Sequence, residues 1–224
     1  MPQKLIVEIW SDVVCPFCYL GKRKFANALS RFAYRDEVEV VWKSFQLNPS
    51  VTTDPTISIN DFLAREKGFD VRTAEQLHDR ITRAGREVGL DYRFDRAIVA
   101  NTFDAHRVIH FASAQGKGDE AFERLFRAYF TEGRNVGDPA TLVELGADIG
   151  LDTPALTAAL ESDAYADDVR SDIEDARQLG INGVPFFVLD RTYGVSGAQD
   201  AVIFLQALEQ ARAERSPSPV VRRS

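Results

Sequence analysis

The strongest constraint on this fold is a pair of cysteines, with two residues between them, where a predicted strand gives way to a predicted helix. Residues 5–10, Leu-Ile-Val-Glu-Ile-Trp, are mostly apolar and β-branched, which is typical of a buried strand. Residues 19–32 space their large apolar side chains at helical intervals, which predicts an amphipathic helix. Cys15 and Cys18 therefore lie at a strand-to-helix junction, with Pro16 in the first helical turn, where its missing N–H costs no hydrogen bond.

This junction has chemical consequences for both thiols. A thiol at a helix N-terminus faces unpaired backbone N–H groups and the positive end of the helix dipole, so the thiolate is favoured. We expect the pKa of Cys15 to lie below the value of about 8.5 of a free cysteine. The spacing keeps both sulfurs within one helical turn, close enough for a short-loop disulfide. The sequence predicts that Cys15 is the nucleophile and that Cys18 resolves the mixed disulfide.

Two other roles of the cysteine pair are weighed against redox chemistry. Free cysteine is often buried as a small apolar residue, so both could simply fill a core. Half of a zinc site is the second alternative, but structural zinc needs four ligands and the sequence holds only 2 cysteines. A redox function is favoured because the spacing and the junction agree with it.

Length and charge narrow the remaining classes. The 224 residues fit one domain, or one domain with a large insertion. A formal net charge of −7 argues against nucleic-acid binding, which usually needs a basic face. No segment approaches the roughly 20 apolar residues of a membrane span. No signal-peptide pattern precedes the first strand, so we expect a cytoplasmic protein whose resting state is the dithiol.

The remaining chain predicts an α/β architecture. Residues 37–45 alternate as a second strand, which gives a βαβ unit with parallel pairing. Residues 51–56 read as a loop, and from about residue 60 to 179 the pattern indicates helices and no convincing strand. The chain returns to the sheet at 183–189, turns at 190–191 and ends with a helix over 198–212.

This order, βαβ…ββα, predicts a thioredoxin fold with a large all-helical insertion. So many helices cannot pack on one small sheet, and they are expected to form a subdomain of their own. The thioredoxin-like domain is expected to be discontinuous, made of residues 1–57 and 180–215. The helical insertion is expected at residues 58–179, and a disordered tail at residues 216–224.

Pro185 tests this topology independently. It is predicted to begin a strand, and the turn pair Asn182-Gly183 precedes it. In thioredoxin-like folds such a proline follows a cis bond beside the cysteine pair, and only X–Pro bonds tolerate the cis form. A cis Val184–Pro185 bond would leave the Val184 backbone free to pair with a substrate strand. A trans proline that starts an edge strand is the alternative, but the topology favours cis.

Three separated motifs resemble one known family. They are Ser-Asp-Val-Val-Cys-Pro-Phe-Cys-Tyr-Leu-Gly at 11–21, Asn-Thr-Phe-Asp-Ala-His-Arg at 101–107, and Gly-Ile-Asn-Gly-Val-Pro-Phe-Phe-Val at 180–188. Nearly the whole chain resembles the DsbA-like superfamily, and most of all its FrnE-like cytoplasmic branch. The resemblance implies a thiol–disulfide oxidoreductase that exchanges a CPFC dithiol or disulfide with protein or small-molecule partners.

The same superfamily leaves an alternative open. Its 2-hydroxychromene-2-carboxylate isomerases and kappa-class glutathione transferases typically carry serine where this chain has Cys15. A glutathione-dependent isomerase or transferase acting on an aromatic compound is therefore a rival, with glutathione as co-substrate; no other cofactor and no metal is expected. A non-enzymatic binding module with structural cysteines is a further rival. Phe17 replaces the histidine of periplasmic DsbA, which implies a less oxidising disulfide here.

The candidate site joins these motifs. Cys15, Cys18 and Pro185 are predicted to be catalytic, and the predicted substrate contacts are Val184, Pro16, Phe17, Asn101 and Arg107. Arg107 could anchor an acidic substrate or a glutathione carboxylate, and a structural salt bridge is equally compatible. Some of the insertion's many aromatic residues could line an apolar groove beside Cys15.

Three further ionisable residues could carry chemistry. Glu8 lies in the first strand and could relay the Cys18 proton, although a paired structural carboxylate is the favoured interpretation. His106 and His110 are four residues apart and could share a metal. Without a third ligand nearby, we expect both to be packed or surface histidines.

Overall fold

A computed structural model describes residues 4–68 and 70–215. Its main sheet has 4 strands in the order β2-β1-β5-β6. Their bounds are Leu5–Ser11 for β1, Val38–Ser44 for β2, Phe186–Leu189 for β5 and Tyr193–Ser196 for β6. β1 pairs parallel with β2 and antiparallel with β5, so the first strand lies inside the sheet. This is the predicted thioredoxin arrangement.

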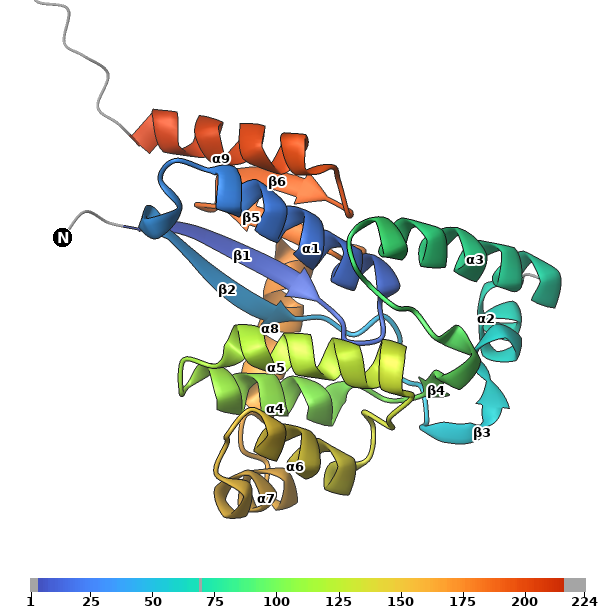
Figure 1. The fold of residues 1–224 in the computed structure, drawn as a ribbon. Helices are drawn as coiled ribbons and strands as arrows, with labels where there is room; N and C mark the ends of the chain where they lie inside the picture. Colours follow the sequence, from blue (N-terminus) through green and yellow to red (C-terminus); the bar gives the residue numbers. More distant parts are fainter. Residues whose placement is uncertain (1–3, 69, 216–224) are drawn as a thin grey trace, which may run out of the picture.

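The period of two along β1 explains why both faces of the sheet are covered. Val7 and Ile9 pack into the large core cluster with Phe204 of α9 (Ala201–Arg215). Trp10 points the other way and packs against Ala176 of α8 (Ala166–Gln178). Figure 1 shows α1 (Pro16–Arg31) and α9 together on one side of the sheet and α8 on the other.

The middle of the chain is helical, as predicted. The helices are α2 (Ile59–Lys67), α3 (Val71–Glu87), α4 (Phe103–Ser113), α5 (Gly118–Arg127), α6 (Pro139–Asp148) and α7 (Thr153–Glu161). A short 3₁₀-helix at Phe94–Arg96 follows α3, and a turn of π-helix at Ala128–Glu132 follows α5; another 3₁₀-helix, Arg35–Glu37, lies between α1 and β2. Four of these helices have an N-cap residue whose side-chain oxygen accepts a hydrogen bond from a backbone N–H of the first turn. The four N-cap residues are Ser58, Asp70, Asp138 and Asp152.

A second, two-stranded sheet was not expected. β3 (Asp54–Ser58) pairs antiparallel with β4 (Ile98–Val99), with a register shift between the paired positions. The sequence predicts a loop at 51–56 and no convincing strand from about residue 60 to 179. A two-residue strand is too short to show a hydrophobic period, and Pro55 argues against a strand unless the strand lies at an edge, as β3 does.

The late part of the sheet matches the expectation closely. Asp190 and Arg191 both have positive φ, at 47° and 55°, as the centre of a type I′ hairpin turn requires. The Val184–Pro185 bond is cis, which confirms the prediction. The tail predicted at 216–224 lies outside the described residues. Within the described ranges, no helix has both the length and the apolar character needed to cross a membrane.

Candidate active site

The two cysteines lie where the sequence predicted. Cys15 is the N-cap residue of α1, and Pro16 occupies the first helical position. The Cys15 N–H donates to the Asp12 carbonyl at 3.0 Å, and the Cys18 N–H donates to the Cys15 carbonyl at 3.0 Å. These bonds form the tight turn that leads from β1 into α1. Both thiols are free and buried, with 3% and 1% of their surface exposed.

The surroundings of Cys18 keep its thiol protonated. Burial raises the pKa of Cys18 well above its ordinary value, and the hydrogen bond and charge of Cys15 raise it further. Interactions with the Asp12 backbone and the Ser11 side chain lower the pKa but do not outweigh burial. A protonated, buried thiol that lies beside Cys15 suits the second, resolving step of an exchange reaction.

The loop before β5 completes the site from the far end of the chain. The Cys15 thiol donates to the Val184 carbonyl at 3.5 Å, across 169 positions of sequence. Pro185 packs directly against α1 at Gly21, where an added Cβ would lie 2.9 Å from the Pro185 Cγ. Glycine at position 21 therefore allows α1 and the proline loop to touch, which brings Val184 to the nucleophile.

A pocket of about 470 Å³ opens beside Cys15. Its mouth is formed by Cys15, Pro16, Phe17 and Val184, and Phe17 is 43% exposed. Its walls come mostly from apolar residues of the helical region and the small sheet, namely Ile59, Phe62, Leu63, Leu77, Ile81, Phe94, Val99, Ala100 and Phe130. The predicted apolar groove is thus present, built largely by the insertion.

One tyrosine of the insertion holds the cysteine turn. The Tyr92 hydroxyl donates to the carbonyl of Pro16, between the two cysteines, at 2.7 Å. The Tyr92 ring is 3% exposed and lies edge-on to Tyr19 and against Gly85, where an added Cβ would come within 2.5 Å of the ring. Tyr92 was not among the predicted site residues, because its partner Pro16 lies 76 positions away in the sequence.

A buried carboxylate and imidazole face each other beside the site, an arrangement that the sequence did not predict. Asp12 is 1% exposed and His106 is fully buried, and His106 Nε2 lies 3.5 Å from Asp12 Oδ1. The other carboxylate oxygen accepts the Leu47 N–H at 2.8 Å. Asp12 lines the pocket, so this pair lies just behind the nucleophile. Both residues belong to the motifs at 11–21 and 101–107, which was the available signal.

The two remaining predicted substrate contacts have structural partners. The Asn101 side-chain amide donates to the carbonyls of Pro49 and Val51, at 3.3 Å and 2.8 Å, and so supports the wall of the pocket without lining it. Arg107 is buried, and it pairs with Asp104 at 2.8 Å. Its guanidinium also donates to carbonyls at the end of α7 and just beyond, those of Ala159, Leu160, Ser162 and Ala164. We therefore leave Arg107 out of the site.

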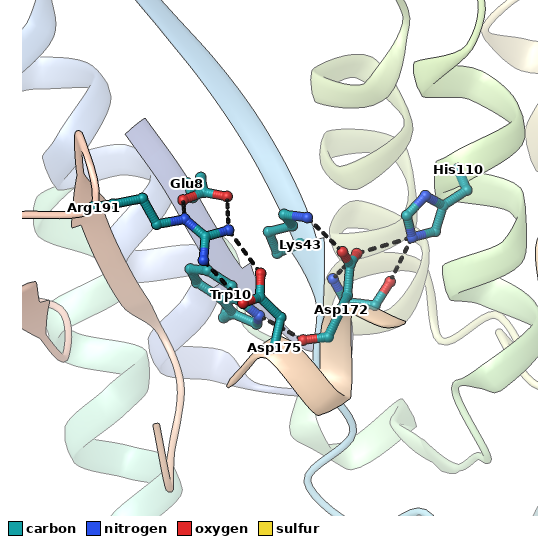
Figure 2. Close-up of polar contacts among 8 residues, drawn as sticks. Glu8, Trp10, Lys43, His110, Asp172, Asp175 and Arg191 are labelled. Carbon is teal, nitrogen blue, oxygen red and sulfur yellow. Dashed lines mark hydrogen bonds and ion pairs between the residues drawn. The ribbon is translucent and has the colours of Figure 1, made fainter. Parts of the chain in front are cut away.

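Glu8 is a paired carboxylate (Figure 2). It lies in β1 and binds Arg191, with Glu8 Oε1 2.5 Å from Arg191 Nη2, while Arg191 also donates to Asp175 at 2.7 Å. The guanidinium carbon of Arg191 lies 5.7 Å from the centre of the Trp10 ring. These contacts commit Glu8 to an ion-pair network, the interpretation that the sequence favoured over a proton relay.

His110 faces a different partner from His106. His110 Nε2 lies 3.0 Å from Asp172 Oδ2 and 3.1 Å from Ser44 Oγ, whereas His106 faces Asp12. Figure 2 shows His110 and Lys43 converging on Asp172. In the part of the chain that the structure describes, no three His, Cys, Asp or Glu side chains are grouped to hold a metal ion. The i, i+4 histidines therefore do not form a common site.

Comparison with known proteins agrees with this geometry. The model of the DSBA-like thioredoxin domain matches residues 6–209. The chain belongs to the DSBA-like thioredoxin domain family. A probable DsbA oxidoreductase from Streptomyces coelicolor is 43% identical, with a TM-score of 0.90 over 95% of this chain and 92% of that one. The arrangement of the cysteine pair beside the proline loop agrees with membership of this DSBA-like family.

Two solved structures share the fold at lower sequence identity, and one further protein is similar in sequence. A 2-hydroxychromene-2-carboxylate isomerase is 15% identical, with a TM-score of 0.67 over 95% of this chain and 100% of that one. The cytosolic disulfide reductase DsbM from Pseudomonas aeruginosa is 21% identical, with a TM-score of 0.61 over 94% of this chain and 96% of that one. The uncharacterised protein YwbO of Bacillus subtilis is 29% identical over 211 residues, which cover 93% of this chain and 98% of YwbO.

Proposed function

We propose that this protein is a thiol–disulfide oxidoreductase that exchanges the Cys15–Cys18 pair with disulfides or dithiols of proteins or small molecules. The observation that carries the proposal is the difference between the two thiols. Cys15 caps α1 at the mouth of the pocket, whereas Cys18 lies one turn further in and is held protonated by burial. Family membership supports the same chemistry.

The reaction proceeds in two displacements. The Cys15 thiolate attacks one sulfur of a substrate disulfide, forms a mixed disulfide and releases the first substrate thiolate, which takes up a proton. Cys18 then loses its proton and attacks the Cys15 sulfur, forming the Cys15–Cys18 disulfide and releasing the second substrate thiol. Two electrons pass from the pair to the substrate. The reverse sequence oxidises a substrate dithiol.

We further propose that the protein acts in the cytoplasm. The structurally similar DsbM, described as a cytosolic disulfide reductase, supports this location and the reducing direction. The substrate approaches between Phe17 and Val184, the two mouth residues beside Cys15. The Val184 backbone would align an extended substrate, as it already accepts a hydrogen bond from the nucleophile.

The deciding experiment is a redox titration. The protein is equilibrated in dithiothreitol or glutathione buffers of graded redox ratio, its free thiols are trapped, and they are counted by mass. The proposal expects one reversible two-electron transition, whose midpoint is compared with a cytosolic potential of about −220 to −320 mV. If no intramolecular disulfide forms at any ratio, the proposal fails. Turnover that survives Cys18→Ser would favour the glutathione-dependent isomerase or transferase instead.

A further inference from the structure

The pocket beside Cys15 also carries information about the substrate, given the proposed function. We infer that it selects disulfides whose reacting cysteine is flanked by an apolar, uncharged group, and that it discriminates against glutathione disulfide. The inference uses the walls of the pocket, the charges in them and their position next to the nucleophile.

The walls provide a surface for an apolar group. Leu63, Leu77 and Phe94 are partly buried wall residues, and Ile81 and Phe130 are almost fully buried behind them. A volume of about 470 Å³ lies within the usual range of small-molecule sites, and it is larger than one aromatic side chain. Burying about 60 Å² of apolar substrate surface here would favour binding by about tenfold.

The ionisable groups of the pocket oppose an anionic substrate. Asp12 and Glu66 both contribute to the lining, and Glu66 accepts a hydrogen bond from Asn48 at 2.9 Å. Among the lining residues that the structure describes, none is a lysine or an arginine. Each half of glutathione disulfide carries two carboxylates and one ammonium group, so it has a net negative charge that it would bring near these acids, with no lysine or arginine in the described lining to pair with it.

His78 does not supply the missing positive charge. Its ring stacks on Phe94, with centroids 3.8 Å apart, and its Nδ1 lies 2.7 Å from Asn60 Oδ1. Burial lowers the pKa of His78 to about 4, although nearby Asp79 acts in the opposite direction. His78 is therefore neutral at pH 7 and adds to the uncharged part of the wall.

The test compares three disulfides that present the same chemistry with different flanks. The reduced protein is mixed with glutathione disulfide, with the disulfide dimer of N-acetyl-glycyl-cysteine amide, or with that of N-acetyl-phenylalanyl-cysteine amide. Each rate is divided by the rate of the same disulfide with dithiothreitol, which removes differences between the leaving thiols. We expect the phenylalanine peptide to react about tenfold faster than glutathione disulfide, and faster than the glycine peptide.

Charge is tested separately at the exposed end of the pocket. Glu66→Lys should raise the normalised rate of glutathione disulfide about threefold or more relative to the rate of the phenylalanine peptide, and this change in the ratio should shrink at high salt. The matched control is Glu75→Lys, an exposed glutamate of α3 that does not line the pocket, which should leave all three rates unchanged.

The outcomes separate the inference from the function on which it rests. If glutathione disulfide reacts as fast as the phenylalanine peptide, or the two peptides react equally, the inference is overturned while the oxidoreductase function stands. If none of the three disulfides oxidises the protein, the proposed function fails and the inference fails with it.

Discussion

Cys15 and Cys18 lie one helical turn apart, yet they occupy different environments. Cys15 caps α1 at the mouth of the pocket, and Cys18 follows it into the helix, where burial raises its pKa well above the ordinary value. The same turn that brings the sulfurs together therefore places Cys18 where burial keeps its thiol protonated. This difference gives each thiol one step of the proposed exchange.

Single-cysteine variants make this difference measurable. In Cys15→Ser, alkylation of Cys18 by iodoacetamide should be slow at pH 7 and should rise only at strongly alkaline pH, because a raised pKa removes thiolate at neutral pH. In Cys18→Ser, alkylation of Cys15 at pH 7 should be about tenfold faster or more. Equal rates for the two variants at pH 7 would contradict the assigned roles.

Phe17 carries no charge that could stabilise the Cys15 thiolate, so a charged side chain at this position should change the reduction potential of the Cys15–Cys18 pair. Because the side chain is 43% exposed, replacement should leave the fold intact. Phe17→His would place an imidazolium near the Cys15 thiolate and stabilise the reduced form, so the reduction potential should become less negative by about 30 mV. Phe17→Leu is the control and should not shift the midpoint. The redox titration measures both, and a more negative midpoint for the histidine variant would disprove this account.

At the scale of elements, the insertion reaches the cysteine turn through Tyr92. Its hydroxyl binds the Pro16 carbonyl, and its ring fills the space above Gly85 on α3. The extended link after α3 is therefore a direct support of the active site. Through this hydrogen bond to Pro16, the helical region can influence the rate of disulfide exchange without supplying a reacting group.

Removing this contact should weaken both the fold and the site. Tyr92→Phe deletes a buried hydrogen bond and should lower the free energy of unfolding by about 1 kcal/mol, with slower disulfide exchange. Gly85→Ala pushes a methyl group against the ring and should cost about 1–3 kcal/mol. Gly183→Ala, with no atom within 4 Å of the added Cβ, is the stability control. Urea unfolding measures all three, and an unchanged Tyr92→Phe would refute the support.

Sequence periodicity predicted most elements, because their signals are local. The apolar run of β1, the alternation of residues 37–45, the helix starts and the turn at residues 190–191 each depend on a few neighbouring residues. Residues of the site were predicted only where they belong to one of the three motifs, at 11–21, 101–107 and 180–188. Arg107 was assigned to substrate because its partners, carbonyls 52–57 positions further along, are invisible in the sequence. Tyr92 was missed for the same reason, since Pro16 lies 76 positions before it.

At the scale of the whole molecule, α8 attaches to the far face of the sheet by charge as well as by packing. Asp172 accepts hydrogen bonds from Lys43 and from the Ser44 N–H on β2, at 2.7 Å and 2.9 Å. Its backbone carbonyl accepts the Trp10 indole N–H at 2.9 Å (Figure 2). Burial by itself raises the pKa of Asp172, but the bonds from His110, Lys43 and Ser44 outweigh burial and lower the pKa.

The lowered pKa has a pH signature in stability. A group whose pKa is lower in the folded state stabilises that state above its unfolded pKa, and this contribution disappears as pH falls through the folded pKa. Asp172→Asn should therefore cost about 3 kcal/mol at pH 7, and the difference from wild type should shrink below the ordinary aspartate value of 3.8. Asp167→Asn, an exposed position on α8, is the control. A pH-independent difference would exclude this linkage.

The contact between Gly21 and Pro185 has an evolutionary consequence. The two residues are far apart in the chain, but their atoms leave no room for a side chain at position 21. A substitution at one of these positions therefore requires a change at the other. A larger residue at position 21 would displace Pro185, and Cys15 would lose its contact with the Val184 carbonyl. We expect relatives that keep proline at 185 to keep the smallest residue at 21, and lineages that abandon one to abandon the other.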